Sequence, residues 1–263
     1  MTAYTRPPAD GHPISRYMQL DVRELDDLDV EGIAPAPAYL RGPRGNLRTG
    51  ALLTMIDNVG GLGGGLAALP DGWVVSTNLA ARVVATTHVG PLRVDAQVLR
   101  RGRNSVVSAV QIHDTGAGGT LVADGVLTSA ILVPANGPPQ WPRPMRLAAP
   151  QPDESPLPIA QWLGVRDVAA GGVEMALAEE LRNPWGILHG GVVAMLVDLA
   201  AERATARTPT DVVLHFLAPN RVGPVRATAR SLGVRGDEAV CRVEVRDMGA
   251  DRVTAVAVVT ARA

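Results

Sequence analysis

The chain has 263 residues, of which 46% are hydrophobic and 19% are charged, and its formal net charge is −1. These proportions are typical of a globular protein with enough apolar side chains for one large domain or for two domains of roughly 100–150 residues each. The small net charge argues against nucleic acid or an anionic membrane as the main partner. All 25 basic residues are Arg, which excludes chemistry that needs a Lys, such as a Schiff base.

The single cysteine, Cys241, excludes a disulfide within the chain and fits a reducing compartment. The N-terminal sequence lacks the apolar core of a signal peptide. No window reaches the ~18 consecutive apolar residues of a membrane-spanning helix. We therefore expect a cytoplasmic protein without a membrane partner.

The first predicted elements are one helix and four strands. An apolar run over residues 48–69 has the length of a helix. Stretches with alternating apolar residues follow it near residues 73–87, 90–101, 105–113 and 120–133. A turn at Gly116 separates two of them, as in an antiparallel meander. One helix set against an antiparallel sheet predicts an α+β fold.

Two short motifs in this half have open interpretations. The run VGGLGGGLAAL (residues 59–69) is not a phosphate loop, because it lacks the GxxxxGK[ST] pattern and follows helical residues instead of preceding them. Its glycines serve either close helix packing or room for a ligand beside Asp57. The cluster RRGR (residues 100–103) is either a solvated hairpin turn or a contact for phosphate groups.

A proline-dense stretch over residues 134–158 separates the two halves. Its composition is typical of a stiffened interdomain linker. We therefore expect an N-terminal domain at residues 1–133, a linker at 134–156 and a C-terminal domain at 157–263. Trp141 is expected to pin the linker to the surface.

The second half repeats the order of the first. A hairpin joined at Ala169–Gly172 comes first, then an apolar helix over residues 189–206, then strands near residues 210–218, 222–234, 238–247 and 252–262. Residues 89–116 align with 222–249 without a gap, and five of the first eight positions are identical. GALLTMID (residues 50–57) likewise matches GVVAMLVD (residues 191–198). These ordered blocks predict an internal repeat.

The second helix starts on Gly190 and Gly191 and carries Asp198 two turns further on. A helix N-terminus presents unpaired N–H groups that favour oxygen anions, and glycine lets a ligand approach them. Asp198 lies among apolar residues, which should raise its pKa towards that of a catalytic base or nucleophile. A simple helix cap with a solvated acid is the alternative.

The pattern of Asn183, Gly186, His189, Gly190, Gly191 and Asp198 resembles the signature of PaaI-like hotdog acyl-CoA thioesterases, a group of the 4-hydroxybenzoyl-CoA thioesterase type. The resemblance implies one long helix wrapped by a curved antiparallel sheet in each half, and hence a tandem double hotdog. It also implies an acyl-CoA substrate, no cofactor beyond the coenzyme A that this substrate carries, and further association into a homo-oligomer.

In that family each site straddles two hotdogs, one giving the carbonyl seat and the other an acid and a hydroxyl. Alignment of the halves places Gly42 at Asn183, Arg48 at His189, Thr49 at Gly190 and Ser76 at Pro209. The resemblance therefore implies one complete catalytic set: Asp57, Ser76, Asn183, His189 and Gly190. The opposite set, Arg48, Thr49 and Asp198, is expected to be degenerate, unless Thr208 or Thr210 replaces the missing hydroxyl.

The expected reaction is thioester hydrolysis, with the Gly190 N–H and Asn183 polarising the carbonyl and Ser76 orienting the water or the acid. Asp57 would act as general base or as nucleophile, and His189 would pack at the helix start. A non-catalytic acyl-CoA-binding hotdog is the alternative, and a hydratase is disfavoured because no Asp shortly precedes Asn183. His88, His113 and His215 lack metal spacing. The few aromatic residues provide no stacking platform for an aryl substrate.

Overall fold

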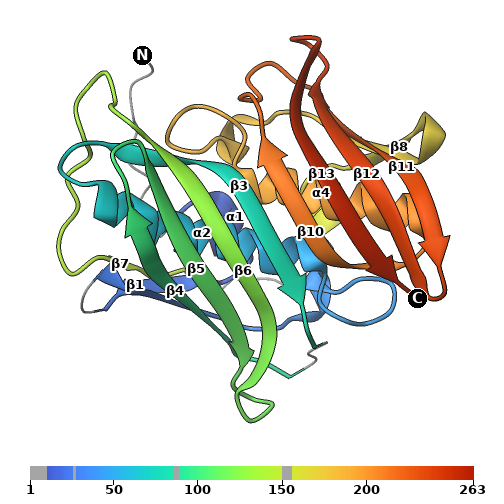
Figure 1. Cartoon of the computed structure of the whole chain (residues 1–263), viewed down its shortest axis with the longest axis horizontal. Helices are drawn as coiled ribbons and strands as arrows, with labels where there is room; N and C mark the ends of the chain where they lie inside the picture. Colours follow the sequence, from blue (N-terminus) through green and yellow to red (C-terminus); the bar gives the residue numbers. More distant parts are fainter. Residues whose placement is uncertain (1–10, 26–27, 86–88, 150–155) are drawn as a thin grey trace.

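The computed structural model describes residues 11–25, 28–85, 89–149 and 156–263. Its strands form one sheet of thirteen strands in the order β7-β1-β2-β4-β5-β6-β3-β10-β13-β12-β11-β9-β8. Two long helices, α2 (Thr49–Ala68) and α4 (Gly190–Thr205), lie side by side against this sheet (Figure 1). No helix in the described ranges is long and apolar enough to cross a membrane.

Each half contributes four long strands that follow its helix in sequence. These are β3 (Trp73–Val83), β4 (Leu92–Arg101), β5 (Ser105–Asp114) and β6 (Thr120–Leu132) in the first half. The second half has β10 (Thr208–Phe216), β11 (Val225–Arg235), β12 (Glu238–Asp247) and β13 (Arg252–Arg262). The predicted helices and strands agree to within a few residues, and the α+β class is confirmed. Residues 86–88, in the first predicted strand, lie outside the described ranges.

Short hairpins close the sheet at both ends. The predicted hairpin is present as β8 (Arg166–Val168) and β9 (Gly172–Met175), and the short helix α3 (Ile159–Trp162) precedes it. At the other end lie β1 (Asp21–Glu24) and β2 (Val30–Ala34), preceded by helix α1 (Pro13–Tyr17). The sequence did not predict these N-terminal elements.

The seam between the halves is the antiparallel pair β3 and β10, which runs from Arg82 opposite Asp211 to Asn78 opposite His215. Every strand pair in the described sheet is antiparallel. Backbone hydrogen bonds therefore continue from one half into the other, and the two halves share one sheet instead of meeting through side chains alone.

The two long helices touch at glycines near their N-termini. A Cβ at Gly50 would lie 2.7 Å from the Met195 sulfur, and one at Gly191 would lie 2.6 Å from the Thr54 methyl group. Only glycine permits this approach. The Thr54 hydroxyl lies 2.9 Å from the Gly191 carbonyl oxygen of the opposite helix. The start of each helix is therefore held against the middle of the other.

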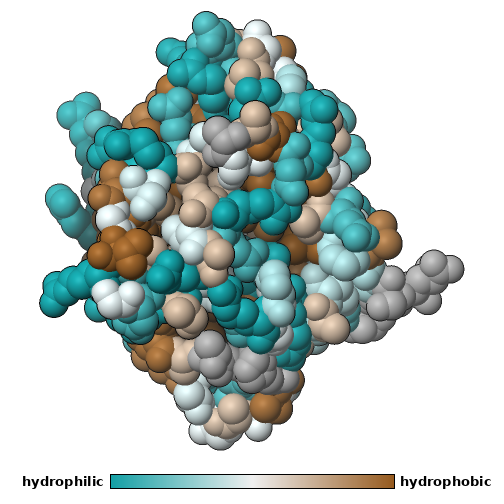
Figure 2. All heavy atoms as spheres, turned by 90° about the vertical axis from the view of Figure 1, so that its right-hand side faces the viewer, coloured by the Kyte–Doolittle hydropathy of each residue, from teal (hydrophilic) through white to brown (hydrophobic). Residues whose placement is uncertain are grey.

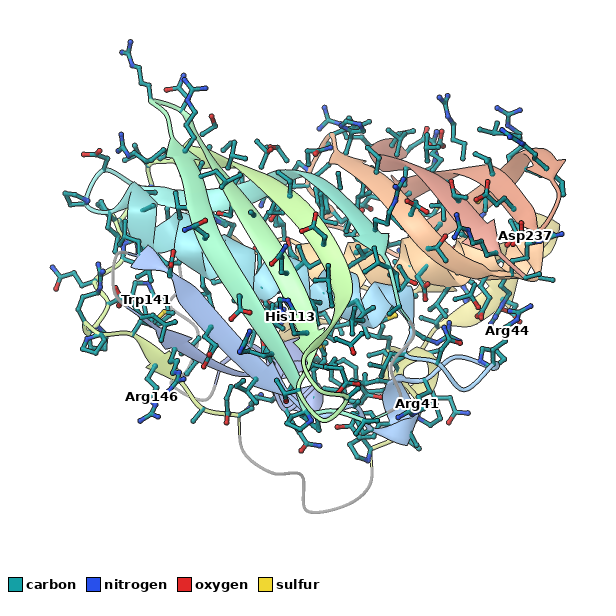
Figure 3. The ribbon with its side chains drawn as sticks, turned by 60° about the horizontal axis from the view of Figure 1, so that its bottom comes forward. Arg41, Arg44, His113, Trp141, Arg146 and Asp237 are labelled. Atoms are coloured by element: carbon teal, nitrogen blue, oxygen red, sulfur yellow. The ribbon has the colours of Figure 1, made fainter. Side chains whose placement is uncertain are left out.

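The proline-dense segment packs on the N-terminal half. Its strand β7 (Arg146–Leu147) pairs with β1, and the Met145 N–H donates to the Glu24 carboxylate at 2.7 Å. Arg143 pairs with the same buried carboxylate. Figure 3 shows Trp141 and Arg146 beside this half. The described part of the predicted linker that follows β6 is therefore packed against the N-terminal half. Residues 150–155 lie outside the described ranges.

Candidate active site

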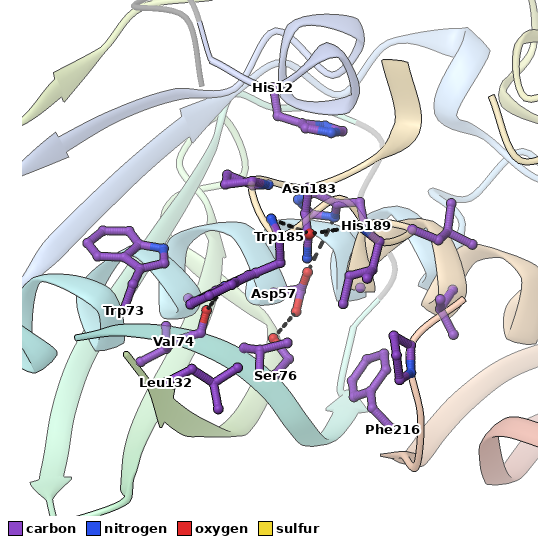
Figure 4. A pocket seen from close by; sticks show the side chains of 18 of the residues that line it. His12, Asp57, Trp73, Val74, Ser76, Leu132, Asn183, Trp185, His189 and Phe216 are labelled. Atoms are coloured by element: carbon purple, nitrogen blue, oxygen red, sulfur yellow. Dashed lines mark hydrogen bonds and ion pairs between the residues drawn. The ribbon is translucent and has the colours of Figure 1, made fainter. Parts of the chain in front are cut away.

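A cavity of about 480 Å³ lies between the halves, with side chains of both in its wall (Figure 4). All five residues of the predicted catalytic set line it: Asp57, Ser76, Asn183, His189 and Gly190. Asp57 and Ser76 come from α2 and β3, whereas the other three come from the loop that leads into α4 and from the first residue of α4. The antiparallel contact of the two helices is the reason, because it places the middle of α2 against the start of α4.

Asp57 is a buried carboxylate in the middle of α2, 6% exposed. The Ser76 hydroxyl donates to its Oδ1 at 2.6 Å. Burial raises the pKa of Asp57 to about 6, although hydrogen bonds from Ser76 and from the Gly191 N–H act in the opposite direction. At neutral pH the group is therefore ionised but more basic than an ordinary Asp, which suits a general base.

Gly190 is the first residue of α4, so its N–H has no acceptor within the helix. A Cβ at this position would lie 2.8 Å from each carboxylate oxygen of Asp57. Any other residue would push the acid away. Glycine therefore allows a carboxylate of one half to lie directly against the helix start of the other.

His189 is the N-cap residue of α4, as the sequence suggests. Its Nδ1 accepts the Gly191 N–H at 3.0 Å, which leaves the ring proton on Nε2. Burial lowers the pKa of His189 to about 4, so the ring is neutral at pH 7. The 3.4 Å contact between its Nδ1 and Asp57 Oδ2 is then no ion pair. His189 is an uncharged cap whose remaining donor is Nε2–H.

Asn183 lies in the tight loop that precedes α4. Its Oδ1 accepts the Trp185 N–H at 2.9 Å and the Ile187 N–H at 3.4 Å. Gly186 closes this loop with a φ of +68°, a conformation that favours glycine. Because the loop occupies Oδ1, the amide Nδ2 is the group that Asn183 presents to the cavity, and Figure 4 shows the side chain beside Asp57.

The opposite set has a different environment. Arg48 is the N-cap residue of α2, and its Nη1 lies 3.3 Å from Asp198 Oδ2 and 2.9 Å from Glu202 Oε2. The Thr49 hydroxyl donates to the Pro209 carbonyl at 2.5 Å. Arg48, Thr49 and Asp198 are absent from the wall of the 480 Å³ cavity. Burial raises the pKa of Asp198 to about 6, with Arg48 opposing the shift.

The backbone supports the alignment that relates these two sets. The Gly42 N–H donates to the Asn46 carbonyl, and the Asn183 N–H donates to the Ile187 carbonyl, in the same place before each helix. The register of strand pairing also shifts directly after Ser76 on β3 and directly after Pro209 on β10. The Thr210 hydroxyl is bound to Asp211 and to the Thr260 carbonyl. Pro209 thus occupies the position of Ser76 without a hydroxyl.

The sequence missed the aromatic part of the cavity. Three of the four tryptophans, Trp73, Trp141 and Trp185, line it, so the prediction that the chain offers no aromatic platform was wrong. Trp141 does more than pin the linker to a surface. These residues are far apart in sequence, and no local pattern joins them.

His12 is a second unpredicted residue of the cavity wall. Its Nδ1 accepts the Ile14 N–H at 3.2 Å, and its Nε2 lies 2.9 Å from the Arg182 carbonyl oxygen. The ring centroid lies 4.5 Å from that of His189. His12 therefore connects the N-terminal helix to the loop that carries Asn183.

The cluster at residues 100–103 is the solvated hairpin turn of the two options, because it lies exposed at the connection of β4 and β5. No residue of the cluster 100–103 lines the cavity, and Arg101 pairs with Asp71 on the surface. Arg221 does line it, from an exposed position after β10. In the ranges that the structure describes, no group of three or more His, Cys, Asp and Glu side chains could hold a metal ion.

Comparison with solved structures identifies the fold. The fold resembles a protein of Alicyclobacillus acidocaldarius with a hot dog fold, with a TM-score of 0.60 and 13% identity over 95% of this chain and 97% of that one. It also resembles the tesB protein of Mycobacterium avium subs. paratuberculosis (TM-score 0.61, 12% identity, 95% and 97% covered). A third is the 12:0-ACP thioesterase of Umbellularia californica (TM-score 0.63, 11% identity, 90% and 95% covered). These likenesses establish the hotdog fold.

Sequence comparison gives matches in part of the chain. Residues 180–262 match the model of the acyl-CoA thioesterase N-terminal domain. A curated relative, the 1,4-dihydroxy-2-naphthoyl-CoA hydrolase of Listeria monocytogenes, is 29% identical over 83 residues, which cover 28% of this chain and 68% of that protein. Residues 180–262 are therefore similar in sequence to thioesterases, which are thioester hydrolases, and the fold is that of a hotdog protein. The resemblance drawn from the motif around Asn183 and His189 is thereby confirmed.

Proposed function

We propose that this protein is a tandem double hotdog that hydrolyses acyl-CoA thioesters at one composite site per chain. The halves are the hotdogs at residues 1–133 and 157–263, joined by the linker at 134–156. Two long helices, two matching sets of strands and the seam between β3 and β10 support this division. The family match to an acyl-CoA thioesterase domain and the CoA thioester substrate of the curated relative support the substrate.

One observation carries the proposal: Asp57, hydrogen-bonded to Ser76, lies against Gly190 at the start of the opposite helix inside a cavity. A thioester carbonyl oxygen seated on the Gly190 N–H and the Asn183 amide would place its carbon beside the acid. Both donors would hold the negative charge that develops on that oxygen, and one such donor is typically worth about 10²–10³ in rate.

In the water route, Asp57 accepts a proton from water as the water oxygen attacks the carbonyl carbon. The tetrahedral intermediate collapses, the C–S bond breaks, and the thiolate of coenzyme A takes the proton back from Asp57. Ser76 orients the carboxylate throughout. In the alternative route Asp57 attacks directly and forms an anhydride. Label found in the enzyme after a single turnover in ¹⁸O-labelled water would demonstrate the anhydride route with hydrolysis at its Asp57 carbonyl, because the water route labels only the released acid.

The opposite set is proposed to be inactive. Arg48 occupies the position of the cap histidine and is paired with Asp198 and Glu202. Thr49 carries a side chain where Gly190 has none, and Pro209 replaces the hydroxyl of Ser76. Asp198 faces the Arg48 guanidinium instead of the cavity, so the position beside it is filled by a cation and not left open for a substrate oxygen.

The test is release of coenzyme A from short-, medium- and long-chain and aryl acyl-CoAs by wild type, Asp57→Asn and Asp198→Asn. We expect Asp57→Asn to lower kcat/KM by about 10³ or more and Asp198→Asn to change it less than fivefold. The reverse ranking would contradict the composite site. If the folded wild type released no coenzyme A from any thioester, the non-catalytic acyl-CoA-binding hotdog would be the better description.

The homo-oligomer and the cytoplasmic location stay predictions. One feature supports association: an apolar row crosses the outer face of the sheet at the seam, where Val126, Val213 and Val258 are 37–43% exposed. The end of the C-terminal half instead mixes hydrophilic and hydrophobic side chains (Figure 2). Sedimentation of the purified chain tests the predicted homo-oligomer.

A further inference from the structure

One face of α2 leads from the acid into the aromatic part of the cavity. Gly61 and Gly65 follow Asp57 at intervals of four residues, so the three positions share one face of the helix. Two turns, about 12 Å, separate Asp57 from Gly65. Gly61 lines the cavity, and a Cβ there would meet nothing within 4 Å. The floor of the cavity beyond the acid is therefore open because position 61 has no side chain.

The far end of this floor is a fixed indole. A Cβ at Gly65 would lie 2.6 Å from the Trp73 ring, so glycine lets Trp73 lie directly on the helix. The Trp141 ring stacks on Trp73 with a centroid distance of 5.7 Å and an interplanar angle of 22°. Both rings are buried. Trp73 is therefore held from two sides and cannot move aside to admit a longer group.

A third indole lies beside this floor. The Trp185 Nε1–H donates to the Val74 carbonyl at 2.8 Å, which fixes the ring in the cavity wall. Figure 4 shows Trp73 and Trp185 on the same side of Asp57, with Leu132 and Val74 close by. Since Trp185 follows Asn183 in the same loop, the residue that seats the carbonyl and the residue that would contact the acyl group are held together.

The charges of the cavity are confined to its reacting end and its rim. Asp57 lies at the helix start, burial keeps His12 and His189 neutral by lowering their pKa values to about 3 and about 4, and Arg221 is exposed. The rest of the described wall is uncharged: it combines apolar side chains and indoles, including Leu62, Leu132 and Leu147, with a few neutral polar groups such as the hydrogen-bonded pair Ser15 and Asn58. An acyl group with its own charge would be desolvated there without a partner.

We propose that Gly61 and Trp73 determine the acyl specificity, and that the preferred acyl group is an uncharged, flat aromatic group lying on Gly61 with its far edge at Trp73. This inference rests on the proposed function. A rigid aromatic group fills a rigid slot without the loss of rotamer freedom that an alkyl chain incurs, and it gains edge or offset contacts with the indoles. Together these effects favour aryl over alkyl groups of equal length by about tenfold in affinity.

The experiment measures binding of non-hydrolysable thioethers by calorimetry, which is independent of turnover. S-benzyl-CoA and S-(2-naphthylmethyl)-CoA are compared with S-hexyl-CoA and S-decyl-CoA. The matched variants are Gly61→Ala and Gly63→Ala, since position 63 is on the same helix, is absent from the cavity wall, and has 3.5 Å to the nearest atom from a new Cβ. Both substitutions replace a helical glycine by alanine, so their effects on helix stability are comparable.

We expect wild type to bind the naphthylmethyl thioether at least tenfold more tightly than the decyl thioether. Gly61→Ala should weaken binding of the naphthylmethyl thioether at least fivefold, whereas Gly63→Ala should not alter it. Trp73→Leu, if it folds, should abolish the preference for aryl groups. Equal or tighter binding of the decyl thioether, or equal effects of the two alanine variants, would overturn the inference. Failure of the proposed function is separate: it would appear as absence of coenzyme A release while the binding preferences persist.

Discussion

Asp57 and Asp198 occupy matching positions on two helices and have the same raised pKa of about 6, yet their surroundings differ. Asp57 faces a glycine, a neutral histidine, a serine hydroxyl and a cavity. Asp198 faces the guanidinium of Arg48. The pKa alone would therefore not distinguish the two acids. The difference lies in whether the opposite helix start leaves room for a substrate oxygen or fills that room with a cation.

The two helix starts can also be compared at two adjacent positions, one where both halves have glycine and one where only the second half does. Gly50 and Gly191 are both present because the helices touch there, against Met195 and Thr54 respectively. At the preceding position the halves differ, since Gly190 lies against the Asp57 carboxylate whereas its counterpart is Thr49. The shared glycine is thus explained by packing, and the unshared one by the contact with the acid.

Among substitutions at the helix starts, Gly190→Ala should have the largest effect on rate. A new Cβ would lie 2.8 Å from both Asp57 oxygens, so the carboxylate would have to leave its seat. We expect kcat/KM to fall by about 10²–10³, as for loss of an oxyanion donor, with little change in the melting temperature. Thr49→Ala, at the matching position of the other half, is the control and should leave kcat/KM within about threefold. Equal losses in the two variants would show that both sites react.

Arg48→Met should give the largest change in stability. It leaves Asp198 and Glu202 buried beside each other without a cation, and breaking a buried pair in this way costs about 3–5 kcal/mol. Urea unfolding at pH 7.5 measures the loss. The double variant Arg48→Met/Asp198→Asn should recover most of it. Activity per folded molecule should persist in both; its loss would give Arg48 a part in the reaction.

Asp57→Asn should make the protein more stable at neutral pH while it removes activity. The pKa of Asp57 in the folded protein, about 6, exceeds the ordinary Asp value of 3.8, so the stabilisation from protonated Asp57 is complete only below about pH 4 and is lost as the pH rises through about 6. Because Asn stays neutral, the free energy of unfolding of the variant should exceed that of wild type by up to about 3 kcal/mol at pH 7.5. Unfolding at pH 4 and pH 7.5 checks the sign, because the gain should appear only at the higher pH.

Ser76→Ala should lower the rate less than Gly190→Ala does, by about tenfold in kcat, but it should have a distinctive effect on the pH profile. The wild-type rate should rise with pH through about 6 as Asp57 loses its proton. Without the Ser76 hydrogen bond, which lowers the pKa of Asp57, the rise should move to higher pH. Thr77→Ser, which keeps a hydroxyl at the next residue, is the control. An unchanged profile in Ser76→Ala would argue against Asp57 as the titrating base.

Local sequence patterns predicted most of the long elements, because α2 is an apolar run of helical length and the valines of β12 and β13 alternate along the strands. They missed the β1–β2 hairpin. There the alternation is short, and the acidic run at residues 24–29 (ELDDLD) has no counterpart in the second half to reveal it. The motif around His189 predicted the carbonyl-binding residues of the proposed site because these residues lie close together in sequence.

The aromatic end of the cavity was not predictable in the same way. Trp73 begins a strand, Trp141 lies in a segment that resembles a linker, and Trp185 lies in a loop. Only the course of residues 134–149 along the N-terminal half brings Trp141 onto Trp73. His12 reaches the site through a hydrogen bond to Arg182, 170 positions away. Such contacts depend on tertiary packing, which neither periodicity nor a motif records.

The seam between β3 and β10 gives the molecule a freedom that a pair of identical subunits lacks. When two identical copies build two equivalent sites, every substitution is made twice, and a residue that harms catalysis harms it everywhere. Here the two helix starts are encoded separately, so one can change to Arg48 and Thr49 while the other keeps His189 and Gly190. The continuous sheet keeps both halves in register regardless. Each half can thereby contribute a different part of the proposed composite site: the first half gives Asp57 and Ser76, and the second gives the helix start at Gly190.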